Sequence, residues 1–238
     1  MGSPPDEPER RPDEGPQQVT LNRGYLLGET EMTVAQFRRF VEERKYRTKA
    51  LGLAPPLDWA NPWPKAKPTD DHPVVCVTWS DADEFCRWLS ARTGRKCRLP
   101  TEAEWECACR AESETAFAVG KKLAPQDANF NGSFESELRA GGGPAPTGTV
   151  PVRRYPPNAW GLYDMHGNAA EWCADPYRTV PLPPSAGVPA PDGGDDEFRV
   201  ARGGSWEAPA EECRSAYRWR RKGSGASPAI GFRVCVEQ

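Results

Sequence analysis

Glycine and proline most constrain what this chain can fold into, because its 238 residues include 22 glycines and 26 prolines. Both residues interrupt regular elements and favour turns. We therefore expect many turns and much irregular backbone, although the proportion stays below that of a low-complexity chain. Nine tryptophans indicate a packed core, and the length suits one large domain or two small ones.

Helical periodicity occurs in three segments. Thr33 is placed to cap a first helix, and Ser80 opens a second that Gly94 ends. A third, short helix begins at Thr101, which forms a capping box with Glu104. These signals predict two main helices and a short one.

Short segments rich in strand-forming residues alternate with loops over the remainder. Residues 22–29, 72–79 and the runs FRVARGGSW, CRSAYRW and GFRVCV have strand composition, whereas helical periodicity is absent from about 110 to 157. The expected fold class is α+β, with mixed short-stranded sheets and long ordered loops.

The first residues differ in composition from the rest. Residues 1–18 hold five prolines and seven charged residues without an apolar block, so we expect residues 1–19 to be a disordered, acidic, Pro-rich leader and residues 20–238 to be a single domain. No apolar run reaches the roughly 18 residues of a membrane helix. The expected location is cytoplasmic, and a net charge of −3 gives no argument for nucleic acid.

The metal-ligand residues limit the possible sites. Eight cysteines lie in helix-like and strand-like segments, so buried, reduced thiols are expected. The spacing of Cys107 and Cys109 does not suit zinc. With only two histidines, a histidine-rich metal site is excluded, and His166 is expected to be an exposed loop residue.

Five tryptophans are expected in the core: Trp79, Trp88, Trp105, Trp160 and Trp172.

Four blocks occur in a fixed order: GETEMTVAQFRRF, then HPVVCVTWSDADEFCRWLSARTGRKCRLPTEAEWECACR, NAWGLYDMHGNAAEWCAD, and RGGSW…CRSAYR…GFRV. Together they resemble the formylglycine-generating enzymes, the family of sulfatase-modifying factor domains. The likeness covers roughly residues 20–238. It implies a C-type-lectin-like fold with two helices, mixed sheets and terminal strands that lie close together.

The oxidase cysteines of that family are incomplete here. The resemblance places them three and eight positions after the serine of RGGS, where this chain has Ala208 and Cys213. A single thiolate cannot supply the two soft donors of a linear copper(I) site. We therefore expect no copper and no oxidase activity. The iron-dependent sulfoxide synthases of the same fold need three histidines, and this chain has two.

The C-terminal segment 202–234 resembles the variable proteins of diversity-generating retroelements. Its words RGGSW, CRSAYR and IGFRV match their fixed frame. The resemblance implies a non-enzymatic protein that displays exchangeable side chains on a rigid scaffold and binds a macromolecular ligand. The residues implied are Glu207, Ala208, Glu211, Glu212, Trp219, Arg220, Arg221, Lys222, Ser224, Gly225, Ser227, Pro228 and Ala229.

Trp219 and the cations beside it are the residue types that dominate binding interfaces. The cations favour an acidic partner, most simply a protein. The alternative is a solvated strand whose arginines cover tryptophan faces, which we expect of Arg214 and Arg218.

The resemblance also implies a structural calcium ion, bound by the carboxylates of Asp164 and Glu171 with the carbonyls of Gly167 and Ala169. Carboxylates and backbone oxygens suit this hard cation, although both carboxylates could instead cap a turn. A second calcium site would begin at Asn129 and Phe130, but it lacks its downstream aspartate.

Two other functions stay open. One is an oxidase or a maturation factor that acts on a protein or peptide. The other is the regulatory domain of a signalling protein, to which the Pro-rich leader would be a linker.

Overall fold

The computed structural model describes residues 1–54, 56–63, 67–179 and 197–238. Its helices within these ranges are α1 (Val34–Arg44), α2 (Trp79–Thr93) and α3 (Glu102–Arg110), with 3-10 helices η1 (Pro12–Glu14), η2 (Lys49–Gly52) and η3 (Ala210–Cys213). Its strands are β1 (Tyr25–Leu27), β2 (Cys97–Arg98), β3 (Ala170–Pro176), β4 (Phe198–Arg202), β5 (Trp219–Lys222), β6 (Ile230–Gly231) and β7 (Cys235–Glu237). The predicted α+β class is confirmed.

All three α-helices begin at a threonine capping box. Thr33, Thr78 and Thr101 each accept the amide of the residue three positions on, whose side chain returns to the cap. This exchange satisfies two backbone donors that the first helical turn leaves open. The second helix thus starts slightly before the predicted Ser80, and it ends as predicted at Gly94, which has φ +68°.

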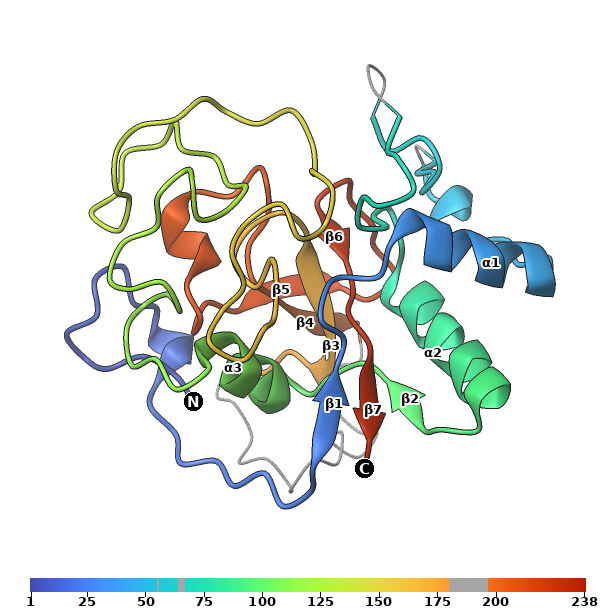
Figure 1. Ribbon diagram of the computed structural model, residues 1–238, viewed down its shortest axis with the longest axis horizontal. Coiled ribbons are helices and arrows are strands. Elements are labelled where there is room, and N and C mark those ends of the chain that lie inside the picture. Colours follow the sequence, from blue (N-terminus) through green and yellow to red (C-terminus); the bar gives the residue numbers. More distant parts are fainter. Residues whose placement is uncertain (55, 64–66, 180–196) are drawn as a thin grey trace.

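Two small sheets form the centre of the molecule (Figure 1). In the first, of order β1-β7-β2, β7 pairs antiparallel with both neighbours, so the strands near the two termini lie side by side as predicted. The second has the order β5-β4-β3-β6. Its pairs are antiparallel except β3 with β6, which is parallel.

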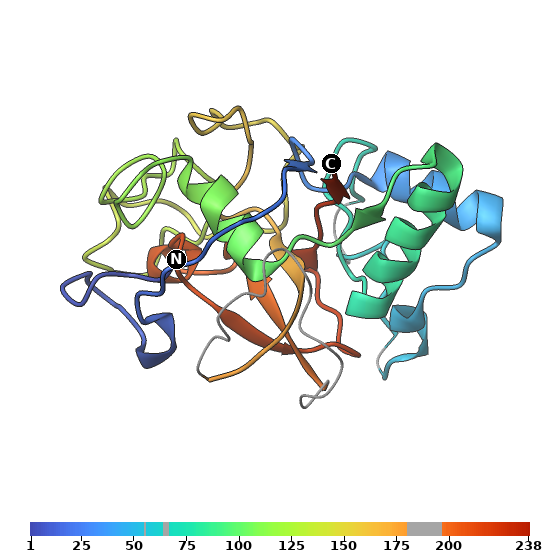
Figure 2. The same ribbon diagram turned by 90° about the horizontal axis from the view of Figure 1, so that it is seen from below.

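Helices α1 and α2 pack against each other on one side of the sheets (Figures 1 and 2). Their interface holds the rings of Phe37, Phe40 and Phe85, which contact one another. Phe37 and Phe85 also contact the ring of Phe232 from the C-terminal segment. Such edge and stacked arrangements favour aromatic pairs. The helices and the C-terminal block thereby share one core.

Three local predictions were wrong. Residues 72–79 do not form a strand: Val74–Val77 are buried but make no ladder, and Thr78 starts α2. Trp160 is 48% exposed rather than in the core. The arginine-rich run Arg214–Arg218 precedes β5 instead of forming a strand. In each case tertiary contacts override the strand or core composition.

The eight cysteines are free, and all except the half-buried Cys107 are buried, which confirms the expectation of reduced thiols. No helix in the described part of the chain is long and apolar enough to cross a bilayer.

The predicted disordered leader is also wrong. Residues 1–17, called here the N-terminal segment, pack on the domain and include the buried side chains of Ser3, Asp13 and Glu14. Figures 1 and 2 show this blue segment beside the orange-red turn that contains η3. Composition failed here because its charged residues are matched by buried charges of the domain.

Candidate ligand-binding face

Four buried arginines anchor the C-terminal segment. Arg202, Arg214, Arg218 and Arg233, called here the frame arginines, are 0–3% exposed. A buried guanidinium needs a carboxylate partner to offset its lost hydration, and each has one: Glu106 for Arg202, Glu14 and Glu7 for Arg214, Glu102 for Arg218, and Glu171 for Arg233. The prediction that Arg214 and Arg218 cover tryptophan faces was wrong; their guanidinium groups lie 5.8 Å and 4.9 Å from the rings of Tyr217 and Tyr177.

The N-terminal segment supplies the partners of Arg214. Both Glu14 oxygens accept from its guanidinium, at 2.6 and 2.9 Å, and Glu7 accepts at 2.8 Å. The backbone carbonyl of Glu9 takes a further bond at 2.7 Å. Asp13 lies 3.6 Å from Arg218. These bonds tie residues 7–14 to the frame and hold the turn before β5 in place.

Between the motifs RGGSW and CRSAYR, only some of the predicted ligand-binding residues face solvent. Glu207 is exposed, Glu211 and Glu212 are half-buried, and Ala208 is buried. Partial burial raises the pKa of Glu207, while the nearby Arg221 guanidinium opposes that rise. Glu207 and Arg221 therefore lie on the same side of the molecule, although they come from different intervals of the segment.

Strand β5 carries the most exposed part of the segment. Arg220, Arg221 and Lys222 are exposed, but Trp219 is only 4% exposed. Trp219 thus belongs to the core, and the prediction that it is a surface hot spot was wrong. Its ring instead holds Arg221, whose guanidinium carbon lies 4.2 Å from the ring centroid, an arrangement that favours a fixed cation.

After β5, the segment contacts the scaffold through its backbone. The carbonyls of Ser227, Pro228 and Ala229 accept from Cys76, the Trp206 indole and Ala170 at 2.9–3.1 Å. Ser224 is exposed, Gly225, Ser227 and Pro228 are half-buried, and Ala229 is buried. The side chains that are both predicted and exposed are Glu207, Arg220, Arg221, Lys222 and Ser224; we call these five the binding face. Ala208, Trp219 and Ala229 lie outside it because they are buried.

A hollow of about 500 Å³ borders the binding face where β5 ends. Gly223 and Ser224 line it together with Lys49 of η2 and Trp79 at the start of α2. Its volume is that of an ordinary ligand pocket.

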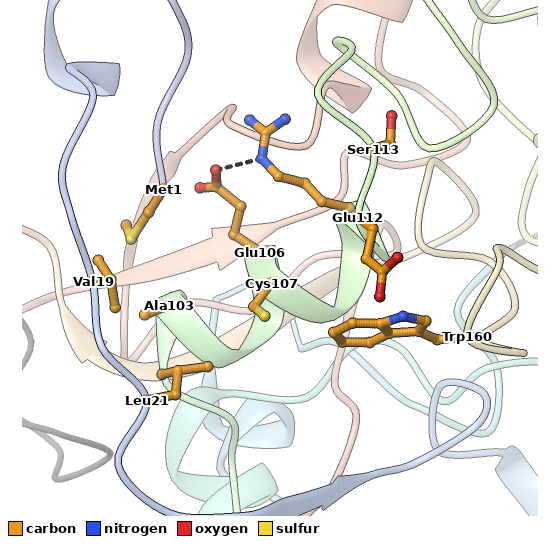
Figure 3. Close-up of a pocket in the computed structure, with 10 residues that line it drawn as sticks. Met1, Val19, Leu21, Ala103, Glu106, Cys107, Glu112, Ser113 and Trp160 are labelled. Atoms are coloured by element: carbon orange, nitrogen blue, oxygen red, sulfur yellow. Dashed lines mark hydrogen bonds and ion pairs between the residues drawn. The ribbon is translucent and has the colours of Figure 1, made fainter.

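A separate cavity of about 430 Å³ lies away from the binding face, between the N-terminal segment and α3 (Figure 3). Figure 3 shows Cys107 of α3, Glu112 and the exposed Trp160 on its walls.

Beneath the segment, His166 links two loops and is buried, so its prediction as an exposed residue was wrong. Its Nε2 accepts from the Ala118 amide at 2.9 Å, and its Nδ1 therefore carries the proton it donates to the Cys213 carbonyl at 2.8 Å. Burial lowers the pKa of His166 to about 4, so the ring is neutral at pH 7.

The single cysteine at the family's oxidase positions is inaccessible. Cys213 is fully buried, and burial raises the pKa of its thiol far above the usual range. A buried thiol with a raised pKa is a poor nucleophile and a poor metal ligand at neutral pH. Ala208 offers no second thiol.

The predicted calcium residues lie in a buried acidic cluster. One oxygen of Asp164 has no hydrogen-bond partner, while the other accepts from the Arg153 amide at 2.8 Å. Glu171 accepts two bonds from Arg233 and one from Trp105. A carboxylate has about four lone-pair positions, so Glu171 keeps one for a cation.

Glu31 adds a third carboxylate to this cluster. It is fully buried, one of its oxygens has no partner, and burial together with Asp164 and Glu171 raises its pKa. Three buried carboxylates facing the single Arg233 guanidinium are a charge excess that a cation would balance. The donors fit calcium in type. However, the described residues hold no group of three or more acidic, histidine or cysteine side chains that could hold a metal ion. A calcium ion here would therefore also need the backbone carbonyls of Gly167 and Ala169 that the resemblance implies.

The second predicted calcium position is occupied by backbone pairing. The backbone carbonyl of Asn129 accepts from the backbone N–H of Asn168 at 2.7 Å. The side-chain amide of Asn129 donates to the Gly148 carbonyl and to the side-chain oxygen of Asn168. Phe130 is buried in the core. This stretch joins the loop of Asp164 to the preceding loop, and Gly167, with φ +76°, has no room for a side chain against Asn129.

Comparison with known proteins defines the class. The model of the sulfatase-modifying factor enzyme 1-like domain matches residues 1–238, and the chain belongs to this family. The match includes the N-terminal segment that composition had set apart.

Among curated relatives, bovine formylglycine-generating enzyme is 30% identical over 98% of this chain and 71% of its own length. The mouse protein named inactive C-alpha-formylglycine-generating enzyme 2 is 32% identical over 96% of this chain and 80% of its own. The serine/threonine-protein kinase pkn1 of Chlamydia caviae is 38% identical over 68% of this chain. The chain spans only 24% of that kinase.

Two solved structures share the fold. PvdO from Pseudomonas aeruginosa superposes with a TM-score of 0.84 at 31% identity, over all of this chain and 90% of PvdO. Treponema denticola variable protein 1 superposes with a TM-score of 0.76 at 22% identity, over all of this chain and 91% of that protein. The predicted C-type-lectin-like fold of the formylglycine-generating type is confirmed.

Sequence reasoning missed the acidic partners of the frame arginines, above all Glu14 and Glu102. Glu102, in the first turn of α3, bonds Arg218 at 2.5 and 3.0 Å. One signal was available in the sequence. The arginines of the motifs RGGSW, CRSAYR and IGFRV would need carboxylate partners once these motifs pack into the core. Which carboxylates serve depends on contacts between distant parts of the chain.

Proposed function

We propose that this protein is a non-enzymatic binding module whose binding face recognises an acidic macromolecular ligand, most simply a protein. Three consecutive exposed cations, Arg220, Arg221 and Lys222, on a strand whose backbone is set by buried ion pairs, carry this proposal. Side chains that point outward from a rigid backbone can bind without rearrangement and can be exchanged without unfolding. The shared fold of the Treponema variable protein supports the architecture alone.

Oxidase activity is the rival that the relatives bring forward. Against it we place the buried Cys213 thiol and the alanine at the other thiol position. A copper-supplemented assay on a cysteine-containing peptide tests the rival, and formation of an aldehyde product would defeat the proposal.

The direct test uses poly-L-glutamate as an acidic probe and poly-L-lysine as its control. We expect poly-L-glutamate to bind with an affinity that falls as salt rises. The triple variant Arg220→Ala, Arg221→Ala, Lys222→Ala should bind it about tenfold more weakly or worse. Equal binding by the triple variant would refute the assignment of the face.

A regulatory module is a second candidate, which the identity with the Chlamydia caviae kinase favours. In that case the same face would bind the acidic ligand that controls an attached catalytic domain. A fusion of this chain to the kinase catalytic domain of that relative would test it, by measuring kinase activity with and without poly-L-glutamate.

We further propose that a calcium ion balances the Glu31, Asp164 and Glu171 cluster. Two carboxylate oxygens without partners support it. The bound ion would stabilise the loop and take no part in ligand chemistry.

A further inference from the structure

Strand β5 lies at the edge of its sheet, in the order β5-β4-β3-β6. An edge strand presents unpaired backbone groups to which another extended chain can add. The register shows which groups these are. The Gly223 backbone N–H donates to the Glu197 carbonyl at 2.8 Å. In the same register Arg221 lies opposite Arg199, and Trp219 lies opposite Ala201.

In an antiparallel pair, alternate residues bond the partner strand while those between face away. The backbone N–H and C=O of Arg220 therefore point away from β4, as does the N–H of Lys222. Phe198 agrees with this register, because its carbonyl accepts from Tyr177 on the β3 side. No residue in the described ranges bonds the Arg220 backbone on its open side.

The cations along this edge are held in place rather than free. The Arg220 guanidinium carbon lies 3.2 Å from the centroid of the Phe198 ring, and Lys222 bonds Glu197 at 2.5 Å. Arg221 lies on the opposite face, over Trp219. Less side-chain entropy is then lost when a ligand binds.

This charge distribution also selects the partner. A second copy of β5 at the same edge would place cations against cations, which opposes self-pairing. A strand with acidic side chains would meet Arg220 and Lys222 on one face and Arg221 on the other. Both faces of the added strand therefore favour carboxylates.

We propose that an extended acidic peptide segment binds by adding to β5 as a new edge strand. Its backbone would bond Arg220, and its Asp or Glu side chains would pair with the three cations. This inference rests on the proposed function and names the form in which the acidic ligand binds.

Backbone methylation of a peptide probe provides the test. The probe is a fluorescein-labelled peptide of alternating glutamate and threonine, measured by fluorescence anisotropy. Its carboxylates share one face of an extended strand and can therefore meet Arg220 and Lys222, the face with two of the three cations. One derivative is N-methylated at every glutamate and the other at every threonine. Because only alternate amides of an added strand face β5, one derivative should bind about tenfold more weakly than the parent and the other within about twofold.

Two variants of the protein complement the peptides. Arg220→Ala removes a charge but keeps the outward N–H, whereas Arg220→Pro removes both, and proline is tolerated where the N–H faces solvent. We expect Arg220→Pro to bind the parent peptide more weakly than Arg220→Ala does, with melting temperatures of both near that of the unsubstituted protein. Arg95→Ala, which removes an exposed arginine in the turn after α2, should bind like the unsubstituted protein.

Two results would overturn the inference. If both methylated peptides bind like the parent and poly-L-glutamate still requires Arg220–Lys222, the face binds through side chains alone and only strand addition fails. If the parent peptide does not bind and poly-L-glutamate binds the triple variant unchanged, the proposed function fails as well.

Discussion

The buried ion pair between Glu14 and Arg214 provides the sharpest test of how the N-terminal segment is held. Glu14 is 1% exposed, Arg214 is 0% exposed, and the two side chains share two bonds of 2.6 and 2.9 Å. The substitution Glu14→Gln keeps the shape of the side chain but removes its charge. Breaking a buried pair from one side costs about 3–5 kcal/mol, because the other charge is left uncompensated.

Glu7 continues to accept from Arg214 at 2.8 Å, so we expect the lower end of this range, about 3 kcal/mol. For a chain of this length that loss corresponds to a fall in melting temperature of about 6–12 °C. Thermal unfolding followed by circular dichroism and urea unfolding both measure it.

Glu9→Gln is the matched control, because Glu9 is exposed and contacts Arg214 only through its backbone carbonyl. It removes the same charge from the same segment and should change stability by no more than about 0.5 kcal/mol. If Glu14→Gln and Glu9→Gln unfold alike, the N-terminal segment does not hold the frame and the reasoning fails. The double variant Glu14→Leu, Arg214→Met should recover only part of the loss, since it removes both charges of this pair but leaves the Glu7 carboxylate without its Arg214 partner.

Four further results are expected. Trp219→Ala should destabilise the fold by about 3–5 kcal/mol because it opens a cavity. Arg220→Ala should change the free energy of unfolding by no more than about 0.5 kcal/mol. If urea unfolding shows the larger loss for Arg220→Ala, the assignment of Trp219 to the core is wrong. Gly204→Ala should destabilise by at least about 1 kcal/mol, because φ is +70° and an added methyl would collide with a buried thiol, and unaltered thermal unfolding would contradict that crowding. The pKa of His166 is about 4 in the fold and about 6.5 unfolded, so the unfolded state binds more protons between these values and stability should fall as pH drops from 6.5 to 4; His166→Asn should flatten this part of the stability–pH curve, and an unchanged curve would rule the residue out. A chelator should lower the melting temperature of the unsubstituted protein but not of Asp164→Ala, and a chelator without effect on either would mean that the acidic cluster holds no calcium.

Elements with local causes could be predicted from the sequence. Each helix start rests on a threonine and a residue three positions later, and these boxes hold α1 and α3 where they were expected. Gly94 ends α2 because the left-handed conformation there suits glycine. The family, too, follows from motifs in a fixed order along the chain.

Burial within the predicted binding segment could not be derived in the same way. Trp219 and Arg221 differ by two positions in one strand, yet one is core and the other exposed. Alternation predicts that Trp219 and Arg221 share a face, but not that the indole packs inward while the arginine stacks over it towards solvent.

The sequence by itself determined the fold class, the starts of α1 and α3, the end of α2, the reduced cysteines and the position of the C-terminal segment, because these depend on composition and on residues close together in the chain. Only the tertiary structure decided that the N-terminal segment is part of the domain, and which carboxylates neutralise the frame arginines. Glu14 and Arg214 are separated by 200 positions. Their pairing depends on where the whole fold excludes water, and no local pattern records that.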